Sequence, residues 1–262
     1  MTACEKTVIL KTTPADEKLV IEGLVTDFPG YQYVKVSRSV SFYQTGKTPR
    51  VTDATVTVTD DLGTVITFDH NPNAHADSAG YYKPLGFVGE IGRTYTLSVD
   101  VDGRHIEATD KLLPVLTLDS LEYQVNEDEE EDPKIDYKFY EVLLYAKEPQ
   151  DTEDFYLFNF YRNDSLVVYN PNDIYYADDV AIGEEINGIP SPVYYAIGDT
   201  ARVEAYSLSR VGYIFYNDLS GLLNNDGGMY SPPPANPRTN LSNGAVGFFQ
   251  VSAVKVLGIK IE

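Results

Sequence analysis

Residues 54–68 read ATVTVTDDLGTVITF, and this stretch decides the fold class. Ala54, Val56 and Val58 alternate with threonines, so apolar and polar side chains fall on opposite faces with the period of a β-strand. A polar turn signal, Asp60-Asp61-Leu62-Gly63, follows this run. The chain then resumes an extended run that ends at Phe68. The stretch therefore predicts a β-hairpin.

Similar short runs separated by polar turns lie on both sides of this hairpin. They include residues 18–26 and 31–43 before it, and residues 94–101 and 104–109 after it. The last two are joined by a second tight turn, Val101-Asp102-Gly103-Arg104. Strands at a spacing of about 8–12 residues favour a β-sandwich. We expect residues 18–114 to form one, with residues 1–17 as a tether ahead of it.

The second half is also predicted to be β-rich, and we assign residues 115–262 to a second domain. Six consecutive acidic residues, 127–132, mark an exposed loop near its start, because like charges repel each other. This run lacks the glycine and the spacing of a calcium loop, and whether it binds Ca²⁺ stays open. Residues 154–169 carry apolar side chains on both faces, which predicts a strand covered on both sides.

Loops and one helix complete the second half. Stretches rich in proline and asparagine predict loops at residues 170–173, 189–192 and 231–237. Near residues 209–225, apolar residues recur at a spacing of three and four, which predicts an amphipathic helix. Ser209 is a suitable N-cap for it, and a Gly-Gly pair at 227–228 would end it.

The net charge of the chain disfavours two kinds of partner, nucleic acid and anionic lipid headgroups. Its 40 acidic and 20 basic residues give a formal net charge of −20, which repels nucleic acid and anionic lipid headgroups. No apolar run approaches the roughly 18–20 residues that a transmembrane helix needs. We expect a water-soluble body that does not bind nucleic acid.

The sequence offers little catalytic chemistry. His70 and His75 lie near two aspartates in a polar loop, but a metal site needs three or four convergent ligands, so we predict no metal and no cofactor. Ser252 and Lys255 match the Ser-x-x-Lys pattern of penicillin-recognising enzymes. They lie in a run with the period of a strand, which directs the two side chains to opposite faces. We predict that the protein is not an enzyme.

Tyrosine is abundant, with 21 residues against no tryptophan. Most of these rings are expected to fill the core of a protein without tryptophan, with their hydroxyls in contact with water. Some could form a binding surface, since tyrosine is enriched at protein interfaces. Our candidate partner-binding residues are Tyr175, Tyr176 and Ile182, in the stretch 170–192. The same stretch could equally fold as a lid over the second domain.

The single cysteine lies at position 4 and is followed by a polar tail. Thr2-Ala3-Cys4 is similar to the last three positions of a bacterial lipoprotein signal peptide. In such proteins the cysteine is acylated and becomes the mature N-terminus. We expect that an apolar signal segment has been removed ahead of it, and that Cys4 carries the lipid that anchors the protein.

Several segments, taken in order, resemble one known family. They are the opening strand Leu19-Val20-Ile21-Glu22-Gly23-Leu24-Val25-Thr26, Val34-Lys35-Val36-Ser37-Arg38-Ser39, the stretch from Asp53 to Asp61, Gly89-Glu90-Ile91-Gly92-Arg93-Thr94-Tyr95-Thr96-Leu97, and the terminal block from Pro234 to Phe249. Together they look like a Bacteroidota lipoprotein family filed as domain-of-unknown-function family 4249. The likeness covers essentially the whole chain.

This resemblance implies a cellular location but no catalytic activity. Such proteins are expected as outer-membrane lipoproteins, on the periplasmic face or the cell surface, often encoded beside TonB-dependent transporters. The opening strand and the Gly-x-x-Tyr-x-Leu strand also suggest that the first sandwich is Ig- or transthyretin-like. The resulting hypothesis is an accessory binding lipoprotein of a TonB-dependent uptake system. The alternatives are a carbohydrate-binding module and an adhesin-like structural surface protein.

Overall fold

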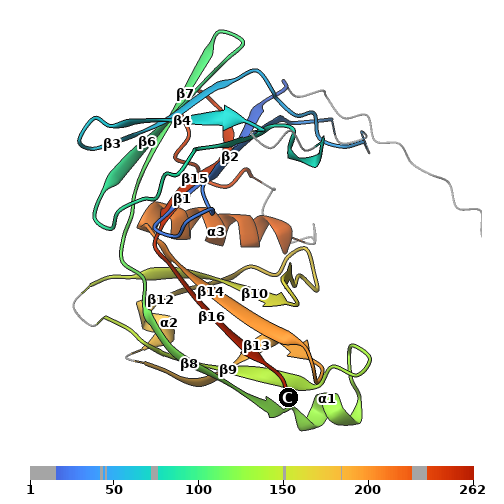
Figure 1. The fold of residues 1–262 in the computed structure, drawn as a ribbon. Coiled ribbons are helices and arrows are strands. Elements are labelled where there is room, and N and C mark those ends of the chain that lie inside the picture. The colour runs from blue at the N-terminus through green and yellow to red at the C-terminus, as the bar shows by residue number, and fades with distance from the viewer. Residues whose placement is uncertain are drawn as a thin grey trace, which may run out of the picture.

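The computed structural model describes residues 16–41, 44, 46–71, 76–149, 152–183, 185–225 and 235–262. Over these residues the fold is all-β, and its strands form two bodies with the longest helix, α3, between them (Figure 1). The predicted class, an all-β protein built from sandwiches with a helix in the second half, is confirmed.

The upper body in Figure 1 is one eight-stranded sheet, in the order β15-β1-β2-β5-β4-β3-β6-β7. It curls until its two edges meet, where the backbone N–H of Val251 in β15 donates to the carboxylate of Asp110 in β7 over 2.9 Å. The body is therefore a sandwich almost closed into a barrel. Its strands are β1 (Leu19–Thr26), β2 (Tyr33–Arg38), β3 (Thr55–Asp60), β4 (Val65–His70), β5 (Tyr81–Lys83), β6 (Thr94–Val101), β7 (Arg104–Lys111) and β15 (Val246–Ser252), with a 3-10 turn at Ala76–Ser78.

Alternating side chains explain why this sheet has one buried face. In β3, Val56 and Val58 are fully buried, and the intervening threonines face outward. The predicted hairpin from β3 to β4 is confirmed, with Val56 opposite Phe68. Its turn is held by the Asp60 carboxylate, which accepts from two backbone N–H groups, those of Leu62 and Thr64. Local turn chemistry therefore sets the register of the strands.

The lower body packs two sheets face to face. One contains β11-β10-β14-β16, with β12 also paired to β10, and the other has the order β13-β9-β8. Their shared core contains Tyr156, Phe160, Val203 and Tyr195. These strands are β8 (Thr117–Val125), β9 (Tyr140–Lys147), β10 (Phe155–Arg162), β11 (Ser165–Leu166), β12 (Tyr175–Asp178), β13 (Glu185–Tyr195), β14 (Thr200–Leu208) and β16 (Val254–Lys260).

Strand β10 is covered on both sides, as its sequence predicts. Tyr156 and Phe160 lie in the core between the two sheets, whereas Phe155 and Leu157 lie in a separate apolar cluster on the other face. The single strand expected over 154–169 is in fact a hairpin. Asn163 and Asp164 both have positive φ and turn β10 into β11.

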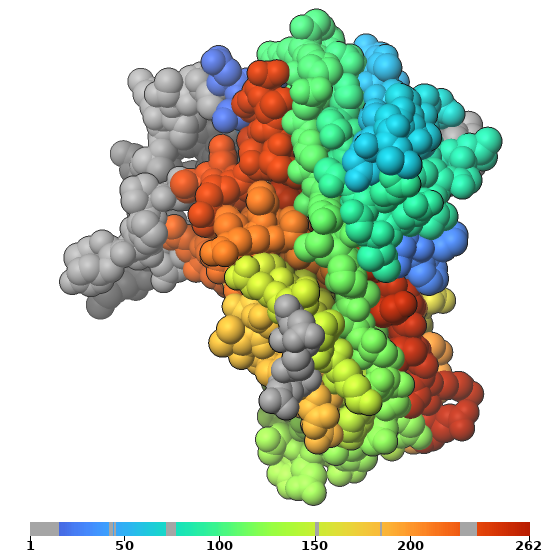
Figure 2. All heavy atoms as spheres, turned by 90° about the vertical axis from the view of Figure 1, so that its left-hand side faces the viewer, coloured from blue at the N-terminus to red at the C-terminus, as the bar shows by residue number. Residues whose placement is uncertain are grey.

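A strand near the end of the chain returns to the first body. Strand β15, which the predicted division at residue 114 leaves in the second domain, runs parallel to β1 and pairs with it from Val20 to Thr26. Gly247 makes this approach possible, since its φ is +107° and a Cβ there would lie 2.0 Å from the carbonyl oxygen of Ile21. Figure 2 shows the orange-red stretch of the chain that contains β15 in the upper body, beside the green stretch that contains β7. The chain therefore crosses between the bodies three times, from β7 to β8, through α3 to β15, and from β15 to β16.

Two of these crossings, from β7 to β8 and from β15 to β16, are fastened by one buried serine. The hydroxyl of Ser207 in β14 donates to the carbonyl of Leu113 over 2.7 Å and accepts from the backbone N–H of Ala253 over 2.9 Å. Its backbone carbonyl accepts from the hydroxyl of Ser252. These bonds hold the two connecting segments side by side. Leu113 and Ser252, one from each segment, also form a parallel β-bridge.

Helix α3 (Arg210–Leu223) forms where its periodicity predicts it. The Ser209 side chain caps it by accepting from the backbone N–H of Gly212 over 3.1 Å, as expected. The helix ends at Leu223 with Asn224 as C-cap. The predicted terminating glycines at 227–228 lie outside the described residues.

Two predicted loops are wrong. The acidic run is largely a short helix, α1 (Glu127–Glu131), capped by Asn126, and Glu129 is buried because its carboxylate binds the Lys134 ammonium at 2.6 Å. Residues 189–192 belong to β13 instead of a loop. This strand lies at the edge of its sheet and its pairing shifts register after Pro190. Edges and bulges are the places where a strand accommodates proline.

A second short helix, α2 (Asp179–Ile182), follows β12 directly. Within the described part of the chain, the search for a helix long and apolar enough to cross a membrane finds none.

Candidate functional site

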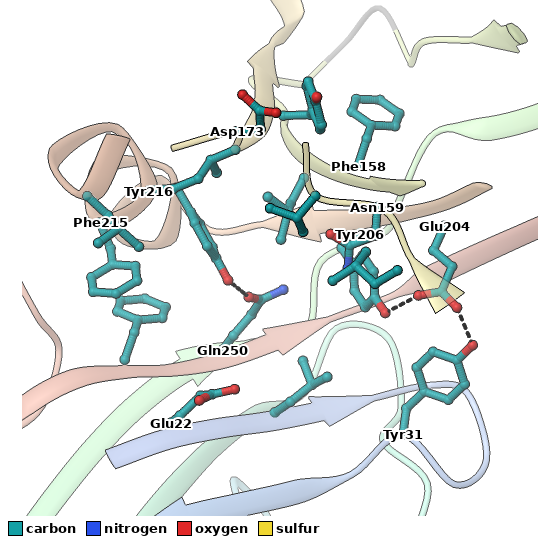
Figure 3. Close-up of a pocket in the computed structure, with 18 of the residues that line it drawn as sticks. Glu22, Tyr31, Phe158, Asn159, Asp173, Glu204, Tyr206, Phe215, Tyr216 and Gln250 are labelled. Carbon is teal, nitrogen blue, oxygen red and sulfur yellow. Dashed lines mark hydrogen bonds between the residues drawn. The ribbon is translucent and has the colours of Figure 1, made fainter. Parts of the chain in front are cut away.

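The outer faces of the two bodies enclose a cleft of about 830 Å³. One wall comes from β1, β2 and β15 of the upper body, and the other from β10 and β14 of the lower body. The residues 166–175 and one face of α3 complete the lining (Figure 3). A cleft of this size between two structural units suits a small organic ligand.

A buried carboxylate holds one end of the cleft together. Glu204 is 1% exposed, and its carboxylate accepts hydrogen bonds from three tyrosine hydroxyls: Tyr31 at 2.5 Å, Tyr206 at 2.6 Å and Tyr161 at 3.0 Å. The guanidinium of Arg202 is its fourth donor. These four donors fill the lone-pair positions that a carboxylate offers, so Glu204 is a structural hub.

Tyr31 makes this hub a link between the bodies. It precedes β2 in the upper body, whereas the other members of the hub lie on β10 and β14 (Figure 3). The Tyr31 hydroxyl also accepts from Nη1 of Arg202 over 3.2 Å, and its ring packs edge-on against Phe28 at 4.9 Å between ring centroids. The guanidinium of Arg202 in turn covers the Tyr161 ring at 3.8 Å. Charge and stacking therefore fix the two walls at this end.

The other end of the cleft is closed by α3. The Tyr216 hydroxyl donates to Oε1 of Gln250 in β15 over 2.6 Å, and Nε2 of Gln250 donates to the Ser252 hydroxyl over 2.7 Å. The Phe215 ring stacks on Phe248 with 4.9 Å between centroids. Leu219 and Leu223 continue the same apolar face of the helix along the cleft.

Two further carboxylates line the cleft. Glu22 of β1 accepts from the Tyr33 hydroxyl over 2.5 Å and pairs with the Lys35 ammonium over 2.9 Å. Asp173 lies across the cleft from Glu22 (Figure 3) and accepts from the backbone N–H of Asn170 over 3.0 Å. Glu22, Asp173 and Glu204 are acidic, whereas Arg202 is the one basic residue among the described lining residues.

The tyrosines of the cleft are neutral phenols. Burial, together with the neighbouring Glu204 carboxylate, raises the pKa of Tyr31 to about 12. Burial also raises the pKa values of Tyr33, Tyr161, Tyr206 and Tyr216, with nearby carboxylates adding to each shift. Each hydroxyl therefore keeps its proton at neutral pH and uses it in the bonds described above.

The predicted partner-binding residues are packed into this half of the molecule. Tyr175 lines the cleft and contacts Phe160 edge-on at 5.3 Å between ring centroids. Tyr176 lies outside the cleft lining, and its hydroxyl donates to Asn217 of α3 over 3.1 Å. Ile182 packs against the core of the lower body. All three are half-buried, so the stretch around them is folded structure.

The other residues singled out from the sequence are not among the described residues that line the cleft. Cys4 and His75 fall outside the described residues. His70 accepts the backbone N–H of Gly80 through Nε2 over 3.0 Å, which gives it a structural partner. Ser252 is fully buried, whereas Lys255 is exposed. Over the described residues, no group of three or more His, Cys, Asp or Glu side chains is placed to hold a metal ion.

Sequence reasoning missed the hub. Period-2 alternation places Arg202, Glu204 and Tyr206 on one face of β14. A glutamate between an arginine and a tyrosine on one strand face is a weak signal for a paired, covered charge. The partners Tyr31 and Tyr161 come from other elements, and no local pattern links them to Glu204.

Comparison with known proteins places the chain in a family. A search of curated proteins found no match. The family model described as Domain of unknown function (DUF4249) matches residues 5–257, which is nearly the whole chain and both bodies of the fold. The protein therefore belongs to this family, as the order of its sequence motifs indicates.

Proposed function

We propose that this chain is a non-catalytic surface lipoprotein that binds a small ligand in the cleft and serves a TonB-dependent uptake system of the outer membrane. The cleft is the observation that carries the binding role. Its walls come from both bodies and are held open by internal bonds, so a ligand meets a preformed site.

The chemistry of the hub favours binding over turnover. A general base needs a free lone pair directed at the substrate. The four donors on Glu204 leave it none, so the buried carboxylate of the cleft holds the walls instead of moving protons. The lining combines aromatic and aliphatic side chains with a few fixed polar groups, as binding pockets for small molecules do.

The binding role is tested by filling the cleft. Leu219 lies on the cleft face of α3, so Leu219→Trp should occupy the space that a ligand needs. Val211→Trp on the same helix is the matched control, because Val211 is exposed and outside the lining. Nile red, a neutral apolar dye, should bind the wild type and Val211→Trp and increase its emission. Equal binding to folded Leu219→Trp would refute the cleft as the site.

The transporter role rests on the family resemblance and on the expected acylation of Cys4. Tyr175 and Tyr176 are packed, so the test uses exposed apolar side chains of the same stretch, Val180 and Ile189. Val180→Glu with Ile189→Glu should reduce recovery of the transporter from native membranes. Val65→Glu, an exposed position in the upper body, is the control. Wild-type recovery with the folded double variant would exclude this surface.

A further inference from the structure

The polar atoms of the cleft are almost all hydrogen-bond acceptors, and this decides what it can bind. The hydroxyls of Tyr33, Tyr161, Tyr206 and Tyr216 each donate their proton to a protein acceptor. Among the described residues, no donor is directed at these four oxygens, so each keeps lone pairs. The carboxylates of Glu22 and Asp173 add further acceptors.

Donors are scarce by comparison. Nε2 of Gln250 is engaged by Ser252, and Nη1 of Arg202 by Glu204 and Tyr31. The side-chain amide of Asn159 can donate or accept. The remaining donors are the Tyr175 hydroxyl, which lies beside the Asp173 carboxylate, and the Arg202 guanidinium, whose Nε is buried with no hydrogen-bond partner and lies 4.0 Å from the Asp164 carboxylate. A ligand with many acceptors would therefore leave most of the polar lining without a partner.

The charge of the lining also disfavours a ligand that is rich in acceptors or negatively charged. Glu204 is compensated by Arg202, and Glu22 by Lys35. Over the described residues, no lysine or arginine forms an ion pair with Asp173, so its half-buried carboxylate leaves a negative field in the cleft. An anionic ligand would lose its hydration and meet this charge without compensation.

One aromatic ring of the cleft lining and one ring behind the lining already accept cations. The guanidinium of Arg202 lies over Tyr161, and the ammonium of Lys35 lies 5.7 Å from the centroid of the Tyr81 ring beside Tyr33. The stacked pair of Phe215 and Phe248 offers an apolar surface at the other end. Rings of this kind attract a cationic group by their negative faces.

We infer that the cleft selects an organic amine, a ligand with an apolar body and a protonated amino group. This deepens the proposed function and rests on it. The protonated amino group supplies hydrogen-bond donors for the tyrosine oxygens. It also supplies a positive charge that can pair with the Asp173 carboxylate. The apolar body lies along α3. Neutral alcohols rank second, and carboxylates are excluded.

Three dansyl probes with one five-methylene chain test this directly. Dansylcadaverine ends in an ammonium group, N-dansyl-5-aminopentanol in a hydroxyl and N-dansyl-6-aminohexanoate in a carboxylate. The protein should bind them in that order in fluorescence titrations, and Leu219→Trp should weaken all three. Asp173→Asn should lower the affinity for the amine by roughly two- to five-fold, the range of a partly exposed ion pair. Asp136→Asn, the same change at an exposed position outside the lining, should leave it unchanged.

The outcomes separate the two proposals. If the carboxylate or the alcohol binds as tightly as the amine and Leu219→Trp still blocks it, the cleft is a binding site and the choice of amine is wrong. Equal affinity for the amine in folded Asp173→Asn would also overturn the choice. If no probe shows binding that Leu219→Trp removes, the proposed function itself fails.

Discussion

Substituting Glu204 should weaken the whole fold, because the hub ties together parts of both bodies. Glu204→Gln keeps the volume of the side chain but removes the negative charge that Arg202 and three tyrosine hydroxyls share. Removing one partner of a buried ion pair costs about 3–5 kcal/mol. A quarter of the Arg202 side chain is exposed and can be hydrated, so we expect a loss of about 3 kcal/mol, the low end of this range.

Tyr31→Phe isolates the part of this loss that links the two bodies. It deletes the hydrogen bond that Tyr31 donates to Glu204 and the longer one that it accepts from Arg202, and should cost at least about 1.5 kcal/mol by itself. In the double variant with Glu204→Gln, the effect of Tyr31→Phe should shrink by at least about 1 kcal/mol, since the two side chains contact each other.

Urea unfolding followed by far-UV circular dichroism measures these changes in the free energy of unfolding. The variants should unfold at a lower midpoint concentration of urea, with an unchanged dependence of the free energy on urea concentration. Tyrosine emission serves as a second probe, because the sequence has no tryptophan. A loss below about 1 kcal/mol for Glu204→Gln, or additive effects in the double variant, would refute the hub as a stabilising link.

Three further predictions concern other parts of the molecule. Gly247→Ala should destabilise the protein by more than about 3 kcal/mol in the same assay, because its Cβ would overlap the carbonyl of Ile21. Gly244→Ala, with positive φ but open space, should cost only about 1 kcal/mol, and equal losses would contradict the close approach. Burial raises the pKa of Asp110 to about 6, above its value in the unfolded chain, so its contribution to stability is complete at low pH and is lost as the pH rises through about 6. The free energy of unfolding of the wild type, compared with that of Asp110→Asn, should fall by about 3 kcal/mol between pH 3.5 and pH 7, since one pKa unit corresponds to about 1.4 kcal/mol. If the difference between the two proteins stays constant over this pH range, the assignment to Asp110 is wrong. In its native host the full-length protein should incorporate a palmitate analogue at Cys4, and labelling that persists in Cys4→Ala would rule this out.

The elements that the sequence predicts well are those with local causes. The hairpin turn at Asp60 is set by contacts within four residues, and the cap at Ser209 by a bond three residues along the chain. The loop predicted at 189–192 failed because Pro190 was weighed without knowing that β13 is an edge strand. The helix at the acidic run was missed because Lys134, which pairs with Glu129, lies beyond the run itself.

The site depends on contacts that no local pattern encodes. Tyr31 reaches Glu204 across the cleft, and β15 joins β1 from the other end of the chain. The contact of Tyr31 with Glu204 and the pairing of β15 with β1 both depend on which surfaces remain exposed once each sheet has formed. The tyrosine-rich composition did predict many buried rings, but it gave no means to say which of the 21 tyrosines line a cleft.

The return of β15 also fixes the order in which this protein can fold. During synthesis the strand that covers the edge of β1 is among the last to emerge, so a chain that stops near residue 114 leaves that edge open. Domains usually fold one after another as the chain is made. Here the first body has to wait for the second, and we expect a fragment of residues 16–114 to aggregate instead of folding. The chain is thus a single folding unit, although it looks like two.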